Sequence, residues 1–572
     1  IENILLEHKD ELVLYKNSIN KAGFLENVVK LFTEFKRYGI SIEDIDKILK
    51  NTENLTLKIK LTEISKIYSL LEDRISDKFV DNEYRLSLLS EKIPSYVNVK
   101  KFEIFFDNFV SFTILEQNVI KNLLKEDIDI TITLAYDIDD DSFEVTKKTL
   151  ENLITMCNIL CKKYTIMHLD KSFKKNEEIR HIEQNFVKNN YCVYKGETNS
   201  IFMISCDNTV TEIHKLADEI NNLIRHHNYK YSDIAVVVSE HEKYGKTINE
   251  IFTKYEIPFF IDSKREITGE NIINLVFSFL DMYVKSPNYV NIMNFFKTGL
   301  TRISKKDYEI FENFMLNWNM DEKKYISEKV FIDDRYFVDE FENQKENIID
   351  TFNFVNSIYK KHKKVFGKKN TCEVFSNQIN IFLEELNVQE HFEILIEKLK
   401  SLGNFELVSE ISQIYNILIK TIDKMNNVID DFAVDVSMYK KMLYQGLNNQ
   451  QIALIPPTID TVMIMDIQRS KSLGYKALFM AGMNDTLLPS VKNTSILLTE
   501  NEKEYMKSAG INLNNSTYDI INQEKMSVYT IISKASERIY FSYAMTDING
   551  RGADKSSYII NLEYIFALYN KI

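Results

Sequence analysis

The sequence predicts an α/β protein whose parallel sheets are interrupted by a long helical insertion. Strand-like apolar segments alternate with amphipathic helices at 101–135 and again from residue 201, and this order is typical of parallel sheets. Residues 270–445 return to apolar residues three or four positions apart, with hardly any strand signal. Sheet character resumes after Pro456-Pro457. A helical stretch of that length is expected to be a subdomain and not a loop.

Each predicted element rests on the local spacing of apolar residues. Residues 1–95 are expected to be helical, because 25–40 and 61–79 place apolar residues on one helical face. Later elements are expected at 101–106 (strand), 114–124 (helix), 128–135 and 201–206 (strands), 211–227 (helix), 234–238 (strand), 245–255 (helix), 461–466 and 476–482 (strands), 525–535 (helix) and 538–543 (strand). The predicted parts are therefore helical, α/β, α/β, helical and α/β, at 1–95, 96–200, 201–275, 276–445 and 446–572.

Composition places the chain among globular proteins without identifying a partner. Its 572 residues are 44% apolar, 12% aromatic and 27% charged, which suffices for several domains with filled cores. The net charge of −13 argues against a uniformly basic nucleic-acid-binding protein. A local basic groove stays compatible with it, because steering depends on where charge lies. The sequence has no apolar run of about 18 residues, so no membrane-spanning helix is expected.

The cysteines predict a reducing, cytoplasmic protein. Cys157 and Cys161 lie at helical spacing without a second ligand pair, and zinc sites need converging ligands. We interpret them as core residues. The chain begins with Ile1 and no signal peptide follows, so it is expected to be a piece of a longer protein. The five cysteines are Cys157, Cys161, Cys192, Cys206 and Cys372.

The segment Gly245-Lys246-Thr247 resembles the end of a phosphate-binding loop, because it follows an apolar strand and opens a helical pattern. Such a loop also needs a glycine five residues before Gly245, where backbone N–H groups close around phosphate. Glu240 stands there, and its carboxylate and that of Glu242 would repel a triphosphate. The segment is therefore expected to be an ordinary helix start.

The strand ending in Asp107 has the Walker B arrangement, in which a carboxylate reaches a Mg²⁺ ion beside the nucleotide. Hydrolysis usually needs a following glutamate to orient water, and Asn108 takes that position. The acidic segment 137–142 invites a calcium interpretation, but it lacks the glycine and the glutamate of a calcium loop, so a solvated turn is expected. The lone Trp318 is expected to be a core residue and not a base-stacking platform.

Two C-terminal stretches resemble motifs of UvrD-like superfamily-one helicases. Residues 462–489 are similar to motif V, and residues 523–543 resemble motif VI. The resemblance implies two RecA-like domains of the P-loop NTPase type, each carrying a helical insertion: 1–95 in the first domain and 276–445 in the second. The residues that carry it are Ser470, Lys471, Gly482, Asp485 and Pro489 for motif V, and Tyr529 and Ala535 for motif VI.

The positions at which this family contacts ATP are altered in the chain. Lys534 keeps the charge of the expected arginine but not its forked geometry, and Ser239 keeps neither. The resemblance thus implies a helicase scaffold with a disabled motor, without catalytic residues or metal ligands of its own. At the altered positions, Asn108 replaces the Walker B glutamate, Ser239 the motif IV arginine, Gln468 the motif V histidine, Gly474 the motif V glutamate and Lys534 the motif VI arginine. Lys471, another of the ATP-contact positions, is retained.

Within that superfamily the chain is most similar to the AddB family, which belongs to the ATP-dependent AddAB helicase–nucleases, through residues 105–117, 229–267, 452–472 and 523–543. The resemblance implies a cytoplasmic protein of double-strand-break repair that binds single-stranded DNA, recognises the Chi sequence and works with AddA. ATP and Mg²⁺ are expected for the full complex. A Walker A segment is expected before residue 1, and a nuclease domain with an iron–sulfur cluster after residue 572.

Two alternatives stay open at this point. The chain could belong to an active ATP-dependent helicase whose Walker A segment precedes it, or it could be a protein scaffold without DNA contact. The acidic balance favours the scaffold, whereas the order of the motifs favours a helicase-like DNA-binding region.

Overall fold

The computed structural model describes two compact units, one formed by residues 1–261 and 460–572, the other by residues 262–459. The helical part predicted at 276–445 lies within the second unit. No helix among the described residues is long and apolar enough to cross a bilayer. The description covers the chain except residues 20, 76–81, 97–101, 137–142, 170–174, 189–190, 263–264, 321–324, 326–327, 339–340, 404, 429–432, 449, 453–459, 468–473, 486, 490–496, 512–516, 548–549 and 567–572.

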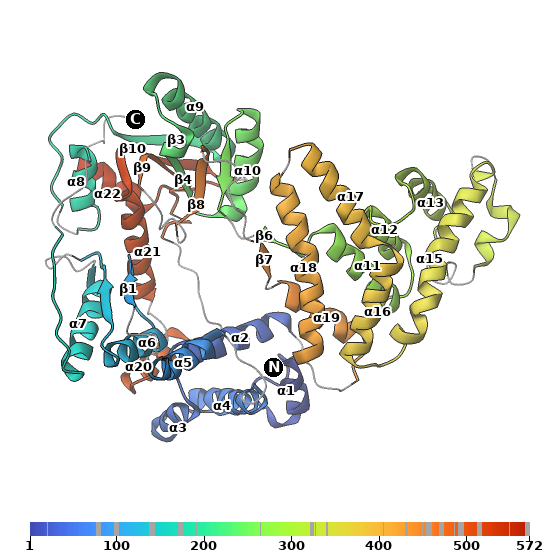
Figure 1. Ribbon diagram of the computed structural model, residues 1–572, viewed down its shortest axis with the longest axis horizontal. Helices are drawn as coiled ribbons and strands as arrows, with labels where there is room; N and C mark the ends of the chain where they lie inside the picture. Colours follow the sequence, from blue (N-terminus) through green and yellow to red (C-terminus); the bar gives the residue numbers. More distant parts are fainter. Residues whose placement is uncertain are drawn as a thin grey trace. The chain divides into compact units, whose positions relative to one another are not determined.

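A six-stranded parallel sheet forms the centre of the first unit (Figure 1). Its strand order, β3-β10-β9-β4-β8-β5, brings distant segments side by side; Val238 of β4 pairs with Ala481 of β9. The predicted α/β class with parallel sheets is confirmed. The strands are β3 (Ile201–Asn208), β4 (Ile234–Val238), β5 (Phe259–Ile261), β8 (Val462–Asp466), β9 (Tyr475–Ala481) and β10 (Ala535–Thr546).

Helices cover both faces of this sheet, which is why its central strands are continuously apolar. All five residues of β4 are buried. Ile234, Val236 and Val238 pack with residues of α9 and α10, whereas Ala235 and Val237 belong to the cluster on the opposite face with α8, α21 and α22. The helices are α8 (Glu177–Asn185), α9 (Thr209–His227), α10 (His241–Lys254), α21 (Thr517–Ile532) and α22 (Ser557–Phe566).

The N-terminal helices of the same unit have a core of their own, to which Leu498 and Met506 from the C-terminal part contribute. A two-stranded parallel sheet follows, with Glu103 paired to Asp129, and the crossover between its strands is α6. The elements are α1 (Glu2–Glu7), α2 (Ala22–Arg37), α3 (Ile42–Asn51), α4 (Leu55–Ile75), α5 (Asn82–Lys92), β1 (Glu103–Phe106), α6 (Ile114–Lys125), β2 (Asp129–Ile132), α7 (Glu144–Ile159) and α20 (Glu500–Ser508).

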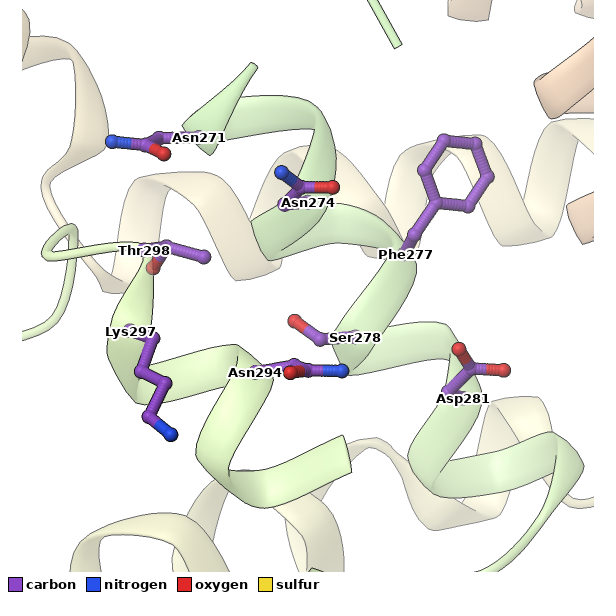
Figure 2. A pocket seen from close by; sticks show the side chains of 8 residues that line it. All are labelled: Asn271, Asn274, Phe277, Ser278, Asp281, Asn294, Lys297 and Thr298. Carbon is purple, nitrogen blue, oxygen red and sulfur yellow. The ribbon is translucent and has the colours of Figure 1, made fainter. Parts of the chain in front are cut away.

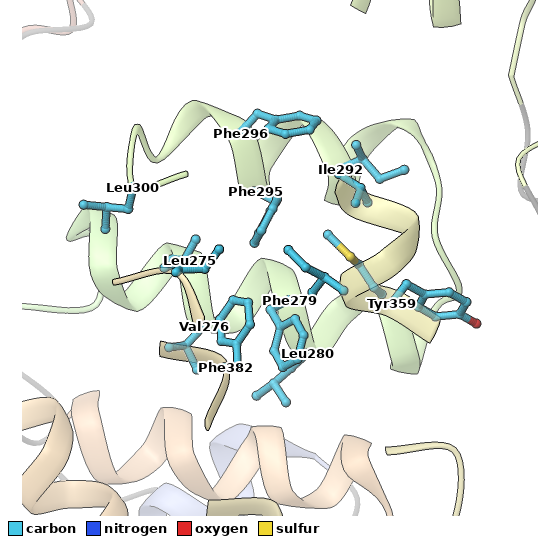
Figure 3. Close-up of a cluster of buried hydrophobic side chains, with 14 of the residues drawn as sticks. Leu275, Val276, Phe279, Leu280, Ile292, Phe295, Phe296, Leu300, Tyr359 and Phe382 are labelled. Atoms are coloured by element: carbon cyan, nitrogen blue, oxygen red, sulfur yellow. The ribbon is translucent and has the colours of Figure 1, made fainter. Parts of the chain in front are cut away.

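The second unit is built from helices around an aromatic core (Figure 3). Phe279 and Phe382 stack with ring centroids 3.7 Å apart. Trp318 packs partly buried against this core and donates its indole N–H to the Tyr336 carbonyl at 3.1 Å, which confirms its predicted place in the core. The elements are β6 (Arg265–Glu266), α11 (Asn271–Val284), α12 (Tyr289–Lys297), α13 (Lys305–Asn317), α15 (Lys345–Phe366), α16 (Cys372–Glu385), α17 (Val388–Ser401), α18 (Phe405–Val428), α19 (Val436–Asn448) and β7 (Gln451–Ile452).

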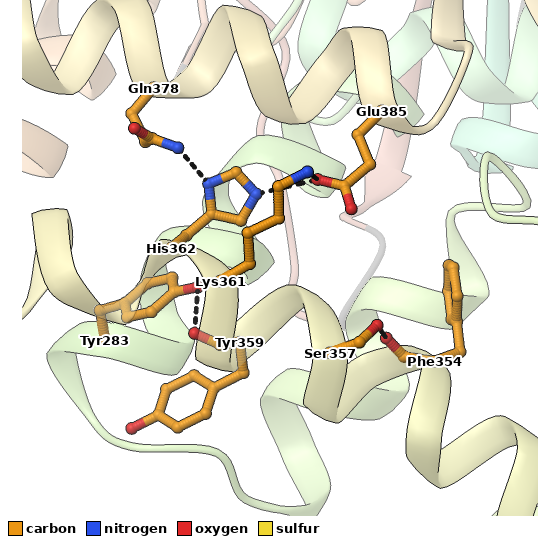
Figure 4. Close-up of polar contacts among 8 residues, drawn as sticks. All are labelled: Tyr283, Phe354, Ser357, Tyr359, Lys361, His362, Gln378 and Glu385. Atoms are coloured by element: carbon orange, nitrogen blue, oxygen red, sulfur yellow. Dashed lines mark hydrogen bonds and ion pairs between the residues drawn. The ribbon is translucent and has the colours of Figure 1, made fainter.

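One buried histidine joins three helices of this unit (Figure 4). His362 of α15 is 0% exposed and lies edge-on to the ring of Phe279. Its Nδ1 accepts from the Gln378 amide at 2.6 Å, and its Nε2 donates to Glu385 at 3.1 Å. Burial lowers the pKa of His362, although the hydrogen bond to Glu385 acts in the opposite direction. The two contacts give Nε2 the donor role and Nδ1 the acceptor role.

Two local predictions are wrong. Gly245-Lys246-Thr247 is not a helix start, because α10 begins at His241 and the segment lies inside it. Cys157 and Cys161 are not core residues: Cys157 is half-buried and Cys161 is exposed. The helix ends at Ile159 and Cys161 has a positive φ of 54°, so the two thiols do not share a helical face. The acidic segment 137–142 lies outside the described residues.

Candidate functional site at the carboxyl edge of the six-stranded sheet

The carboxyl ends of parallel strands meet at one edge of a sheet, and in α/β proteins ligands bind outside that edge. Here β3 ends at Asn208, β4 is followed by Ser239, and β9 is followed by Gly482. In the register of the sheet Ser239 and Gly482 are neighbours, since Val238 pairs with Ala481. Polar groups from three strands are thus gathered at the carboxyl edge.

A buried carboxylate occupies this edge. Glu212 is 0% exposed and accepts three hydrogen bonds. The Gly482 N–H and the Ser542 hydroxyl donate to its Oε1 at 2.9 and 2.6 Å, and the Tyr244 hydroxyl donates to its Oε2 at 2.9 Å. Burial raises the pKa of Glu212, while the three donors act in the opposite direction. The carboxyl group is therefore a structural centre that ties α9, α10, β9 and β10 together.

The start of α9 places this carboxylate. Asn208 caps the helix, accepting from the Thr211 N–H at 2.9 Å, and the Thr211 hydroxyl closes the reciprocal bond at 3.1 Å. The cap fixes Glu212 in the first helical turn. The positive end of the helix dipole lies there and favours a negative charge.

Tyr244 and Ser239 form the rest of the packing around the carboxylate. Tyr244 is 2% exposed, and burial together with the neighbouring Glu212 raises its pKa. The Ser239 hydroxyl oxygen is buried and has no hydrogen-bond partner among the described residues. An added Cβ on Gly482 would lie 2.4 Å from that oxygen. The edge is therefore closely packed by its own side chains.

Replacing Gly482 by alanine is expected to destabilise the sheet-containing unit by about 2–4 kcal/mol, because the position combines strain with a clash. Its φ is +72°, and the added Cβ would also lie 2.9 Å from the Tyr244 ring. Gly550 has a φ of +75° but nothing within 4 Å of an added Cβ, so Gly550→Ala measures the backbone cost alone. Urea unfolding followed by circular dichroism compares the two variants; equal losses would contradict the close packing at Gly482.

The loop after β9 is held by Asn484. Its amide donates to the Ala544 carbonyl at 2.7 Å and accepts from the Ala544 N–H at 3.3 Å. The Asp485 N–H donates to the Asp554 carbonyl at 2.9 Å. Asn484 therefore connects the loop after β9 to β10, and Asp485 connects it to the segment after β10.

The altered ATP-contact positions that the structure describes do not come together. Ser239 lies at the carboxyl edge, whereas Lys534 immediately precedes β10 at the amino edge, where its carbonyl accepts from the Tyr475 N–H at 2.9 Å. Tyr475 and Ala481 are the two ends of β9, about 20 Å apart at the usual rise of a strand. Gly474 directly precedes β9 at the same amino edge. Gln468, Ser470 and Lys471 lie outside the described residues.

Asp107 and Asn108 lie at the end of β1, in the two-stranded sheet. Asp107 is exposed, and its Oδ1 accepts from the Thr133 hydroxyl at 2.5 Å. The Asn108 N–H donates to the same hydroxyl at 2.8 Å, with a positive φ of 59° at Asn108. The structure therefore brings these two residues to the end of the neighbouring strand β2.

The sequence patterns did not single out Glu212, Tyr244 or Ser542. Glu212 carried a readable signal, because it lies on the buried face of α9, four positions before Leu216 and next to Ile213, both 0% exposed. A charged residue on an apolar helical face needs buried partners. Those partners come from 32, 270 and 330 residues away in the chain, so the sequence alone could not identify them.

The comparisons with known proteins agree with the fold. The profile of the family described as UvrD-like helicase C-terminal domain matches residues 151–546, and that described as ADDB, N-terminal matches residues 1–183. Among similar proteins, the B subunit of the ATP-dependent helicase/deoxyribonuclease of Thermoanaerobacter sp. (strain X514) is 30% identical over 586 residues, which cover 99% of this chain and 51% of the relative.

Proteins of the same name are also similar in Clostridium species. The one from Clostridium botulinum (strain Hall) is 31% identical over 99% of this chain and 51% of its own length. The one from Clostridium novyi (strain NT) is 29% identical over 99% of this chain and 50% of its own length. The chain thus spans about half the length of the curated relatives it matches. Since the UvrD-like profile covers more than half of the chain and the N-terminal profile and the relatives agree with it, the chain belongs to the UvrD-like helicase family and is of the AddB type within it.

Proposed function

We propose that this chain is the helicase-like, ATPase-inactive region of an AddB-type protein, and that it binds single-stranded DNA, including the Chi sequence, in a helicase–nuclease complex with an AddA motor. The relatives are named as the B subunit of an ATP-dependent helicase/deoxyribonuclease, which supports membership of such a complex. In this proposal, AddA supplies ATP hydrolysis and the present chain supplies the DNA-holding surface.

The observation that carries the proposal is the closed carboxyl edge of the six-stranded sheet. A nucleotide bound at such an edge needs backbone N–H and hydroxyl donors directed at its phosphates. Here the Gly482 N–H and the Ser542 and Tyr244 hydroxyls all donate to Glu212. A buried carboxyl group at this edge, beside Ser239 in place of the motif IV arginine, disfavours an anionic ligand there. Asn108, in place of a water-orienting glutamate at the end of β1, supports the same conclusion.

An ATPase assay tests this proposal. The chain alone is expected to release no phosphate above background with Mg²⁺-ATP, and added single-stranded DNA should not change that result. Adding AddA should restore DNA-stimulated hydrolysis, since the motor is then present. Hydrolysis by this chain that rises with single-stranded DNA would overturn the inactive-motor proposal and favour an active helicase.

A protein scaffold without DNA contact is the second candidate, favoured by the net charge of −13. Binding of a labelled single strand at increasing salt separates the two functions. If the chain has a DNA-holding surface, the logarithm of its affinity falls linearly with the logarithm of the salt concentration, since phosphate contacts release counterions. Chi-containing strands are expected to bind more tightly than scrambled strands when AddA is present. No binding at low salt, with or without AddA, would favour the scaffold.

A further inference from the structure

Polar side chains from two helices of the second unit line a shared pocket of about 330 Å³ (Figure 2). One side of α11 is buried in the aromatic core, with Leu275 and Phe279 at 0% exposure. The opposite side carries polar residues three or four positions apart. Across the pocket, α12 contributes Asn294 and Lys297, and Thr298 follows directly after that helix. The pocket is thus a polar feature on an otherwise apolar helix pair.

Amide side chains dominate the pocket. Asn271, Asn274 and Asn294 line it, and all three are exposed. The Asn274 amide N–H donates to the Gly269 carbonyl at 2.8 Å, which leaves its side-chain oxygen available as an acceptor. An amide offers a donor and an acceptor side by side. This is the pattern that pairs with the edge of a nucleobase, and with adenine in particular.

An aromatic surface adjoins these amides. Phe277 lines the pocket half-buried, and its ring lies edge-on to Tyr444 of α19 with centroids 5.8 Å apart. Tyr444 is 48% exposed, so its ring is accessible beside the pocket. Bases of single-stranded nucleic acids stack on such rings with little dependence on sequence.

Each of the two charged residues in the pocket, Asp281 and Lys297, has a partner of opposite charge. Asp281 forms an ion pair with Lys440, and Lys297 lies 2.9 Å from Glu312. The Lys297 side chain is 51% exposed. A neutral interior selects a ligand through hydrogen bonds and stacking rather than through charge. The pocket therefore suits an uncharged base better than a phosphate, with Lys297 available at the rim for the backbone.

We propose that this pocket takes one base of a single-stranded nucleic acid, adenine in preference. The asparagines Asn271 and Asn294 hydrogen-bond to the base edge, Phe277 provides the stacking surface, and Lys297 contacts the adjoining phosphate. The inference rests on the proposed function in one respect, that the chain binds single-stranded DNA at all. It adds a site for one base within the helical unit.

The test compares oligo(dA) with an abasic oligonucleotide of the same length, by fluorescence anisotropy. The unsubstituted chain is expected to bind oligo(dA) at least about fivefold more tightly, the size of one base stacked and hydrogen-bonded. The double substitution Asn271→Ala, Asn294→Ala should reduce this preference for oligo(dA), since only the stacking on Phe277 is kept, and leave abasic binding unchanged. Both residues are exposed, so the fold should persist, as circular dichroism can check.

Asn416→Ala is the matched control, because Asn416 is also exposed, lies on α18 of the same unit and hydrogen-bonds within its own helix. It should bind both oligonucleotides as the unsubstituted chain does. An unchanged preference in the double variant overturns the pocket proposal and leaves the proposed function standing. Loss of AddA binding by the double variant with unchanged DNA binding would also overturn it, making the pocket a protein contact. Failure of the unsubstituted chain to bind any oligonucleotide overturns both.

Discussion

Replacing Glu212 by alanine is expected to destabilise the sheet-containing unit by about 3–5 kcal/mol, because three buried donors lose their acceptor. The substitution removes a fully buried side chain and leaves the Gly482 N–H and the hydroxyls of Ser542 and Tyr244 without their acceptor. These donors cannot reach water without opening the edge of the sheet. Urea unfolding followed by circular dichroism measures the loss.

Glu219→Ala is the control on the same helix. Glu219 is half-buried and forms an i,i+4 ion pair with the exposed Lys215, and such helical pairs contribute only about 0.3–0.5 kcal/mol. Glu212→Gln keeps the shape and one acceptor oxygen, so its loss should lie between those of the two alanine variants. A Glu212→Ala variant as stable as Glu219→Ala would show that the carboxylate does not hold the edge together.

Replacing His362 by alanine is expected to destabilise the helical unit by about 3–4 kcal/mol, because a ring buried among aromatic side chains is removed. The Gln378 amide would also lose its acceptor on the ring, whereas Glu385 would keep its ion pair with Lys361. Thermal unfolding of the variant at neutral pH measures this loss.

The same histidine predicts a dependence on pH. Burial lowers the pKa of His362 in the folded chain below its ordinary value of 6.5. The unfolded chain therefore takes up a proton first as the pH falls, and folding loses stability from about pH 6.5 downward. Above about pH 6.5, the stabilisation of the folded chain by the neutral His362 ring is fully present. Thermal unfolding between pH 5.5 and 8 should show this slope in the unsubstituted chain and a reduced slope in His362→Ala.

His391→Ala is the control for the titration. His391 lies on α17 of the same unit and is not fully buried. Its variant should keep the slope of the unsubstituted chain. An equal slope in His362→Ala and the unsubstituted chain would assign the acid sensitivity to another group.

The sequence predicted the regular elements well where one periodicity dominated. The helix expected at 211–227 is α9 at Thr209–His227, and the strand expected at 234–238 is β4 over the same residues. The start of α10 was missed because its N-cap, Glu240, makes no side-chain capping bond that a sequence signal could reveal. The helix begins four residues before Gly245 because Tyr244 is one of the buried residues of its apolar face.

The candidate site was harder to predict than the fold. Motif spacing identified Ser239 and Lys534 as altered positions but gave no information about the edge of the sheet on which each lies. The edge follows from the strands, because Ser239 follows β4 and Lys534 precedes β10, and the strands are parallel. Glu212 stayed unnoticed because its three donors converge only after the sheet has formed.

Trp318 is the only tryptophan in the chain, and it packs against the core of the helical unit. Its fluorescence therefore reports one unit, while circular dichroism averages over both. The His362→Ala variant should shift the fluorescence transition, whereas Glu212→Ala should shift only the dichroism signal if the units unfold independently. Coincident shifts in both variants would mean that the two units share one cooperative transition. A single native tryptophan thus measures how strongly the inserted unit is coupled to the domain that carries it.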